Sequence, residues 1–195
     1  MRAVHTARTL AGRERLEGTT DHQKVSDIVY IEYSHFYIAE QIESFDFSTG
    51  GPVFVHPGQI TVFSRVQTHR VPVTLEIAGE PHAVGEGWEL LGSYPYRPVR
   101  DGRMTLSAPS PGASPEKLQL ETGTVYSVHI YAKGRRDSLE RWDAAMARGD
   151  YGVDTGFEEY LAVFTPTGSQ QPPAVSAPER RIVVDEEGHR PANRE

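Results

Sequence analysis

The stretch Val71-Pro-Val-Thr-Leu-Glu-Ile77 alternates between large apolar residues and others for seven positions. Successive side chains of a β-strand point to opposite faces, so positions 71, 73, 75 and 77 share one face. A period of two with one apolar face predicts a strand that covers a core on one side and meets water on the other. Pro72 has no backbone N–H, and we expect it at a sheet edge or at the start of the strand.

Other segments on both sides of this strand also have strand character. Residues 28–38 are rich in β-branched and aromatic side chains, which favours a strand. Apolar groups occupy both of its faces, so we expect it to be buried on both sides or bent by a bulge. Alternation or short apolar runs predict further strands at 53–55, 60–66, 88–94, 104–106, 118–120, 126–131 and 160–164.

One helix is predicted late in the chain, over residues 138–148. Asp137 or Ser138 can cap its start, and Gly149 can end it. Apolar residues recur at helical spacing and predict a stripe that packs on a sheet. The stripe consists of Leu139, Trp142 and Met146.

Many short strands and one helix predict an all-β protein, an antiparallel β-sandwich with one short late α-helix and disordered termini. Residues 1–24 are predicted to be a flexible N-terminal arm, 25–166 the sandwich domain, and 167–195 a disordered tail rich in proline. Residues 182–184 of the tail could dock as an edge strand. Residues 107–115 contain serine, proline and glycine and predict a loop.

The charge is concentrated in the predicted domain, where residues 25–166 hold 19 acidic and 11 basic side chains. Phosphate backbones repel such a domain, so we expect no nucleic-acid partner. The charge favours a protein partner with a basic surface, although ordinary solubility also explains it. No apolar run is long enough to span a bilayer, and no secretory signal precedes the domain. We therefore expect a cytoplasmic protein with no membrane partner.

The residues that could carry chemistry follow no specific motif. No cysteine is present, no GxSxG elbow and no glycine-rich phosphate loop, so no catalytic residue is assigned and no cofactor is expected. The eight histidines show no metal-binding spacing. Three of them lie in or beside predicted strands. Each could be an ordinary core or surface histidine, or the three could converge and bind a metal. These are His35, His69 and His129.

Exposed aromatic residues are the other candidates, because tyrosine and tryptophan dominate the energetics of protein interfaces. A basic cluster, residues 133–136, could hold an acidic ligand or form a solvated loop. The tyrosines predicted to contact a partner are Tyr94, Tyr96, Tyr131 and Tyr151.

The strand Tyr33-Ser-His-Phe-Tyr-Ile38 resembles the opening strand of the competence protein J family of nuclease inhibitors. Residues 123–128 follow in the order that this family shows. His35 departs from the pattern, which has glutamine there. Residues 128–137 and 158–166 also resemble the ends of uncharacterised actinobacterial β-sandwich proteins. Together these resemblances span residues 28–166 and imply a non-enzymatic inhibitor or immunity-like protein, acidic so that it covers a basic nuclease.

Two functional hypotheses follow. The first is an acidic binding module that blocks a basic partner such as a nuclease. The second is a small-molecule or metal-dependent β-sandwich or barrel enzyme that uses the three strand histidines. The oligomeric state is not predicted by any feature of the sequence.

Overall fold

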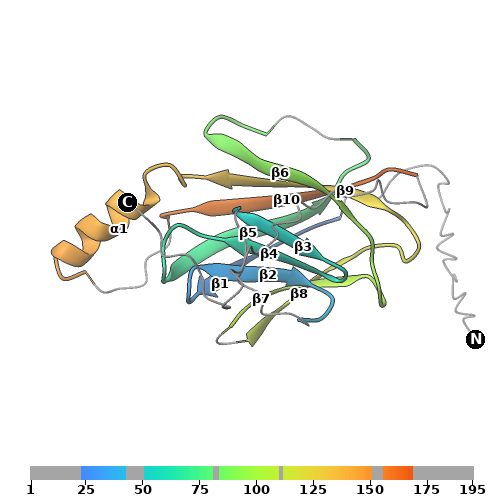
Figure 1. Cartoon of the computed structure of the whole chain (residues 1–195), viewed down its shortest axis with the longest axis horizontal. Coiled ribbons are helices and arrows are strands. Elements are labelled where there is room, and N and C mark those ends of the chain that lie inside the picture. The colour runs from blue at the N-terminus through green and yellow to red at the C-terminus, as the bar shows by residue number, and fades with distance from the viewer. Residues whose placement is uncertain (1–22, 43–50, 81–83, 110–111, 151–155, 169–195) are drawn as a thin grey trace, which may run out of the picture.

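The computed structural model describes residues 23–42, 51–80, 84–109, 112–150 and 156–168. Almost all of the predicted arm and tail, the segment 182–184 and Tyr151 lie outside the described residues. The described chain folds into two five-stranded sheets and one helix (Figure 1). None of the described helices is long and apolar enough to cross a membrane.

The two sheets divide the strands as follows. In order across the first sheet lie β1 (Lys24–Ile31), β5 (His69–Ile77), β10 (Glu159–Pro166), β9 (Tyr126–Lys133) and β6 (Trp88–Tyr96). In order across the second lie β3 (Val53–His56), β4 (Gln59–Phe63), β2 (His35–Ala39), β7 (Arg103–Ala108) and β8 (Gly112–Gln119). All pairings are antiparallel except that of β5 with β10, which is parallel.

The inward faces of the two sheets form one apolar core. The predicted row on β5 is buried along its whole length, with no member more than 9% exposed. Rows on β9 and β10 join it, and the second sheet closes the core with Phe36, Ile38, Ile60 and Val62. The predicted β-sandwich is therefore confirmed, with one parallel pair inside a mostly antiparallel architecture.

The segment 28–38 is not the single strand that its composition predicts. The chain leaves the first sheet at Ile31 and enters the second at His35, so two strands of two different sheets adjoin in sequence. Tyr33 and Ser34 make the corner with φ values of 59° and 61°, in the left-handed region that few residues other than glycine adopt. The change of sheet explains why apolar groups occupy both faces.

The strain at the corner predicts an order of stability among variants of Tyr33, whose side chain is 68% exposed. Asparagine tolerates a positive φ and valine does not, so Tyr33→Asn should be at least as stable as the parent chain and Tyr33→Val less stable by about 1–2 kcal/mol. Urea unfolding of the three proteins measures the order. Equal stability of the valine and asparagine variants would show that the corner stores no backbone strain.

Pro72 occupies a place that neither predicted alternative describes. It is the fourth residue of β5, and β5 is an interior strand between β1 and β10. Pro72 pairs with Ile28 of β1, while the ladder to β10 begins one residue later, at Val73. At Pro72, strand β5 is therefore paired on one side only, with β1. Because the ladder to β10 has not yet begun there, the proline interrupts no ladder hydrogen bond with β10.

Two further strands extend beyond their predicted limits. The predicted loop at 107–115 gives way to β8, which begins at Gly112 and pairs with β7 at the edge of the second sheet. Strand β6 continues through Pro95, which an edge strand tolerates. A bulge between Leu90 and Gly92 shifts its register, so the simple alternation predicted for residues 88–94 fails there.

The helix α1 (Ser138–Ala147) matches the prediction in position but not in packing. It projects from one end of the sandwich and lies across neither sheet (Figure 1). Leu139 is 40% exposed, and only Ser138 and Ala145 are buried within the helix. Arg141 holds the helix instead, by donating to the carbonyl oxygens of Gly134 and Phe157 at 2.9 and 2.5 Å.

Candidate functional site

The three predicted histidines do not converge. His35 lies in the second sheet, and His69 and His129 lie on different strands of the first. His35 contacts the Tyr33 carbonyl through Nδ1 at 2.8 Å and the Tyr37 hydroxyl through Nε2 at 2.9 Å. In the described part of the chain, no group of three histidine or carboxylate side chains could hold a metal ion. The shared metal site of the alternative hypothesis is therefore wrong.

The predicted tyrosines have different environments. Tyr96 is 2% exposed, and its hydroxyl donates to the Met104 sulfur at 3.2 Å, so its ring cannot anchor a partner as predicted. Its strand turns this residue inward, toward the space between the sheets. Tyr94 is half-buried and packs against the same core. Tyr131 lies on the outer face of the first sheet, and Tyr151 lies outside the described residues.

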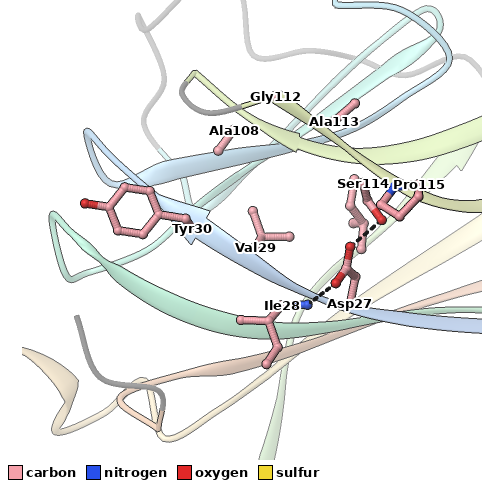
Figure 2. Close-up of a pocket in the computed structure, with 10 residues that line it drawn as sticks. Asp27, Ile28, Val29, Tyr30, Ala108, Gly112, Ala113, Ser114 and Pro115 are labelled. Carbon is pink, nitrogen blue, oxygen red and sulfur yellow. Dashed lines mark hydrogen bonds between the residues drawn. The ribbon is translucent and has the colours of Figure 1, made fainter. Parts of the chain in front are cut away.

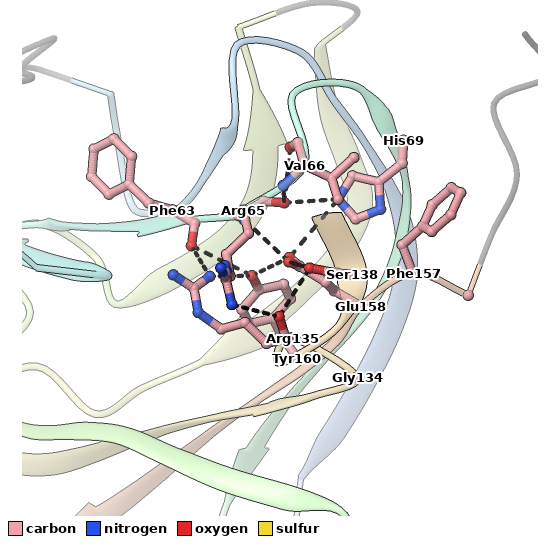
Figure 3. A network of polar contacts seen from close by, with 12 residues as sticks. Phe63, Arg65, Val66, His69, Gly134, Arg135, Ser138, Phe157, Glu158 and Tyr160 are labelled. Atoms are coloured by element: carbon pink, nitrogen blue, oxygen red, sulfur yellow. Dashed lines mark hydrogen bonds and ion pairs between the residues drawn. The ribbon is translucent and has the colours of Figure 1, made fainter. Parts of the chain in front are cut away.

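A buried carboxylate, Glu158, lies at the centre of a cluster of polar groups (Figure 3). It lies just before β10 and is 1% exposed. Its Oε1 accepts from the Arg65 backbone N–H at 3.1 Å and the Ser138 hydroxyl at 2.6 Å. Its Oε2 accepts from the Tyr160 hydroxyl at 2.5 Å. The carboxylate therefore joins the end of β4, the start of α1 and β10.

Arg135 supplies the positive charge of this cluster. The basic residues 133–136 were expected either to hold an acidic ligand or to form a solvated loop, and Arg135 does neither. Its Nη1 donates to the Phe63 carbonyl at 2.6 Å and to the Tyr160 hydroxyl at 3.2 Å. Burial and the neighbouring Glu158 raise the pKa of Tyr160 well above its usual value, so the phenol keeps the proton that it donates. Arg135 is thus committed to the fold rather than to an acidic ligand.

His69 completes the cluster and is fully buried. Its Nε2 lies 2.9 Å from the Ser64 hydroxyl and 3.9 Å from Glu158 Oε2, while Nδ1 has no partner among the described residues. Ser64 donates its own proton to the Val66 carbonyl at 2.9 Å. This network assigns the imidazole proton to Nε2, because that nitrogen faces the serine oxygen and the carboxylate. Burial lowers the pKa of His69 to about 4, against the opposing effect of Glu158.

The cluster contains serine, histidine and glutamate but not the geometry of a hydrolase triad. A triad needs the carboxylate on one ring nitrogen and the nucleophile on the other. Here Ser64 and Glu158 both face Nε2, and the serine proton already belongs to a backbone carbonyl. Every one of these side chains is buried, so the cluster joins strands and does not meet a substrate.

The outer face of the first sheet carries a second, exposed arrangement, which the strand register defines. Side chains of β10, β9 and β6 form three rows across this face, beginning at the end of the sheet near α1. The rows are Glu159, Lys133 and Trp88, then Leu161, Tyr131 and Leu90, then Val163, His129 and Ser93.

Part of this face is covered and part is open. After β5, Ala78 joins Leu161 and Val163 in a small apolar cluster on this face, and Val84 packs against that cluster. Leu161 and Val163 are 9% and 2% exposed, whereas Leu90 is 54% exposed. The covered half is over β10, and the open half is over β9 and β6.

Polar and ring contacts fix the side chains of the open half. His129 contacts the Ser93 hydroxyl at 2.7 Å and the Ser127 hydroxyl at 3.2 Å, and its ring stacks on that of Tyr131 with centroids 6.5 Å apart. Lys133 places its ammonium 6.0 Å from the Trp88 ring centroid. Burial lowers the pKa of His129.

A cavity of about 200 Å³ lies between β1 and the strands β7 and β8, at an open side of the sandwich. Figure 2 shows Asp27 reaching across it toward β8, where its carboxylate accepts a short hydrogen bond from the Ser114 hydroxyl. The other Asp27 oxygen accepts from the Ile28 N–H at 2.7 Å. The cavity is small beside ligand pockets of roughly 300–1,000 Å³.

Comparison with known proteins shows which fold this chain resembles, but it identifies no family. No protein-family model matches the sequence, and no curated protein sequence matches it. The crystal structure of ComJ, inhibitor of the DNA degrading activity of NucA, from Bacillus subtilis is similar with a TM-score of 0.51 at 9% identity, over 74% of this chain and 98% of that chain. A structure described as crocagin biosynthetic gene J has a TM-score of 0.44 at 11% identity, over 75% of this chain and 98% of that chain. The chain therefore has a fold similar to that of ComJ, from one end of ComJ to the other.

Proposed function

We propose that this chain is a binding module that blocks a partner protein, and that the partner is a nuclease. The observation that carries the proposal is the likeness to ComJ, whose described role is inhibition of the DNA degrading activity of NucA. The likeness spans 98% of ComJ, so it extends beyond a shared core of a few strands. At 9% identity the likeness supports a shared fold. The inhibitory role of this chain is what we propose from that fold.

Two features of the chain agree with a binding role. The buried polar groups around Glu158 serve to join strands, which leaves the polar chemistry of the interior committed to the fold. The outer face of β9 and β6 instead presents aromatic and apolar side chains to solvent. The acidic excess of residues 25–166 suits a basic partner, as nucleases that bind DNA phosphates are.

The test begins with tagged full-length chain as bait in an extract of its source organism. The retained protein is identified, purified and assayed for cleavage of linear DNA while the chain is titrated in. We expect cleavage to fall in proportion to added chain and to stop near one chain per nuclease. An unrelated acidic protein of similar net charge is the control for nonspecific masking.

Two results would count against the proposal in different ways. A retained partner without nuclease activity would remove the nuclease and leave the binding role. A retained nuclease that still cleaves DNA at saturating chain would remove the blocking role.

A further inference from the structure

The open half of the outer face has the properties of a binding surface. We call it the β6–β9 face and define it as Trp88, Leu90, Ser93, His129, Tyr131 and Lys133. Leu90 is 54% exposed at its centre, beside the half-buried ring of Tyr131. Val84 packs with Leu161 and Val163 over the β10 half of this sheet, and Leu90 remains exposed on the other half. An aromatic and apolar centre of this kind is typical of the anchors that dominate protein interfaces.

The ring and lysine side chains around Leu90 are held in place before any partner arrives. Ser93 and Ser127 hold His129, which in turn stacks on Tyr131. Lys133 lies over Trp88, and its alkyl chain packs against Gly87, where an added Cβ would lie 3.6 Å from the lysine Cε. Side chains that are ordered in advance lose less conformational entropy on binding, so they contribute more to affinity.

Carboxylates accompany this face. Glu86 is exposed just before β6, two residues from Trp88, and Glu80 is exposed in the connection from β5. Glu159 lies in the same row as Lys133. Three acidic side chains therefore accompany a face that contains one lysine, and that lysine is already engaged with Trp88. A basic partner surface would complement these carboxylates.

We propose that the β6–β9 face is the surface through which this chain binds its partner, and that the partner presents basic residues around an apolar centre. The inference rests on the proposed function and adds the site and the chemistry of the partner. The apolar centre supplies most of the binding energy, and the carboxylates accelerate association.

The cavity beside β1 is the other candidate surface, and its chemistry is weaker. Ile28 is 53% exposed there, but among the described residues that line it the only charged group is Asp27. That carboxylate already accepts from Ser114 and from the Ile28 N–H. It therefore carries no group that points to a particular partner, and it serves below as a comparison.

The first experiment places a photo-crosslinking amino acid in the full-length chain at one of three exposed apolar positions. Position 90 is the test, and positions 28 and 139 are the comparisons, since Ile28 and Leu139 are also exposed. Each protein is irradiated in extract of the source organism, and adducts are identified by mass spectrometry. We expect an adduct with one basic protein at position 90 and none with that protein at the other two.

The purified protein from that adduct is then the probe for affinity measurements by titration calorimetry. Leu90→Ala and Tyr131→Ala should each weaken binding at least about tenfold, which corresponds to the loss expected on truncating an interface anchor. Leu139→Ala, a matched leucine on α1, should change the affinity less than twofold. Leu90 and Leu139 are both on the surface, so neither variant should alter the unfolding transition.

A charge variant tests the carboxylates separately. Glu159→Lys should slow association severalfold and reduce its dependence on salt, because rim charges act mainly on the association rate. Glu116→Lys on β8, at the far edge of the other sheet, is the matched control with the same charge change. Stopped-flow or surface-bound kinetics at two salt concentrations give both rates.

The outcomes separate this inference from the proposed function. An adduct at position 28 alone, or unchanged affinity for both alanine variants, overturns the β6–β9 face while the binding role stands. An acidic partner overturns the stated chemistry. No adduct at any position, together with no protein retained by the tagged chain, overturns the face and the binding role together.

Discussion

Glu158→Ala should lower the free energy of unfolding by about 3–5 kcal/mol, the loss expected when one member of a buried charged network is removed. The carboxylate is 1% exposed and accepts from three donors, the Arg65 N–H and the hydroxyls of Ser138 and Tyr160. Alanine would leave those donors facing a space without an acceptor. Tyr160, which also accepts from Arg135, would lose the acceptor of its own proton.

Glu159→Ala is the matched control, because the same change is made one residue further along. Glu159 points to the outer face and forms no buried network, so its loss should alter stability by about 0.5 kcal/mol or less. Glu158→Gln should fall between the two, since the amide keeps the shape and one acceptor but loses the charge. Urea unfolding of the three variants measures the differences. Equal effects of the two alanine variants would show that the cluster does not stabilise the fold.

Glu158 illustrates what the sequence could and could not predict. Read in isolation, the pair Glu158-Glu159 resembles an ordinary surface pair. The period of two in the following strand could have predicted that Glu158 is buried. Tyr160 and Phe164 face the core, and Glu158 lies two residues before Tyr160, on the same face. The donors that satisfy the carboxylate could not be predicted, since Arg65 and Ser138 are distant in sequence.

The period of two in the sequence correctly predicted the strands that lie in the interior of the first sheet. It succeeded for β5, β9 and β10, because each keeps one face on the core from end to end. It failed at Tyr33, where the chain changes sheets. The corner depends on backbone contacts from elsewhere, in which the Ser34 N–H donates to the Gln67 carbonyl and the Ser64 N–H to the Ser34 carbonyl. No local pattern encodes those contacts.

The β6–β9 face was predictable in part. Alternation on β9 places Tyr131 and His129 on the outer side, as the sequence predicts. Trp88 and Leu90 join this face through the pairing of β6 with β9, and Ser93 joins it only because of the bulge after Leu90, and neither feature is local in sequence. Tyr96 shows the opposite error, because its strand continued through Pro95 and carried the ring into the core.

Lowering the pH from 7 to 5 should reduce the free energy of unfolding by about 2 kcal/mol through His69 alone. The reason is that the unfolded chain takes up one proton at this residue in that range and the folded chain does not. Burial lowers the pKa of His69 to about 4 in the folded chain, while the unfolded chain has the ordinary value of about 6.5. Between these values the unfolded state binds a proton that the folded state does not. The stability is therefore complete above pH 6.5 and is lost as the pH falls toward 4, where the total loss reaches about 3 kcal/mol.

His69→Gln isolates this contribution, because glutamine carries no titratable group and can still donate to the Ser64 hydroxyl, which now lies 2.9 Å from His69 Nε2. Urea unfolding at several pH values between 5 and 7 compares the variant with the parent chain, above the range in which most carboxylates titrate. The parent should lose about 2 kcal/mol more than the variant across that interval. His129→Gln, a change at a half-buried histidine on the outer face, should remove a smaller part of the slope. Parallel pH profiles for His69→Gln and the parent would mean that His69 is protonated in the folded chain, beside Glu158, and that the neutral imidazole assigned to the cluster is wrong.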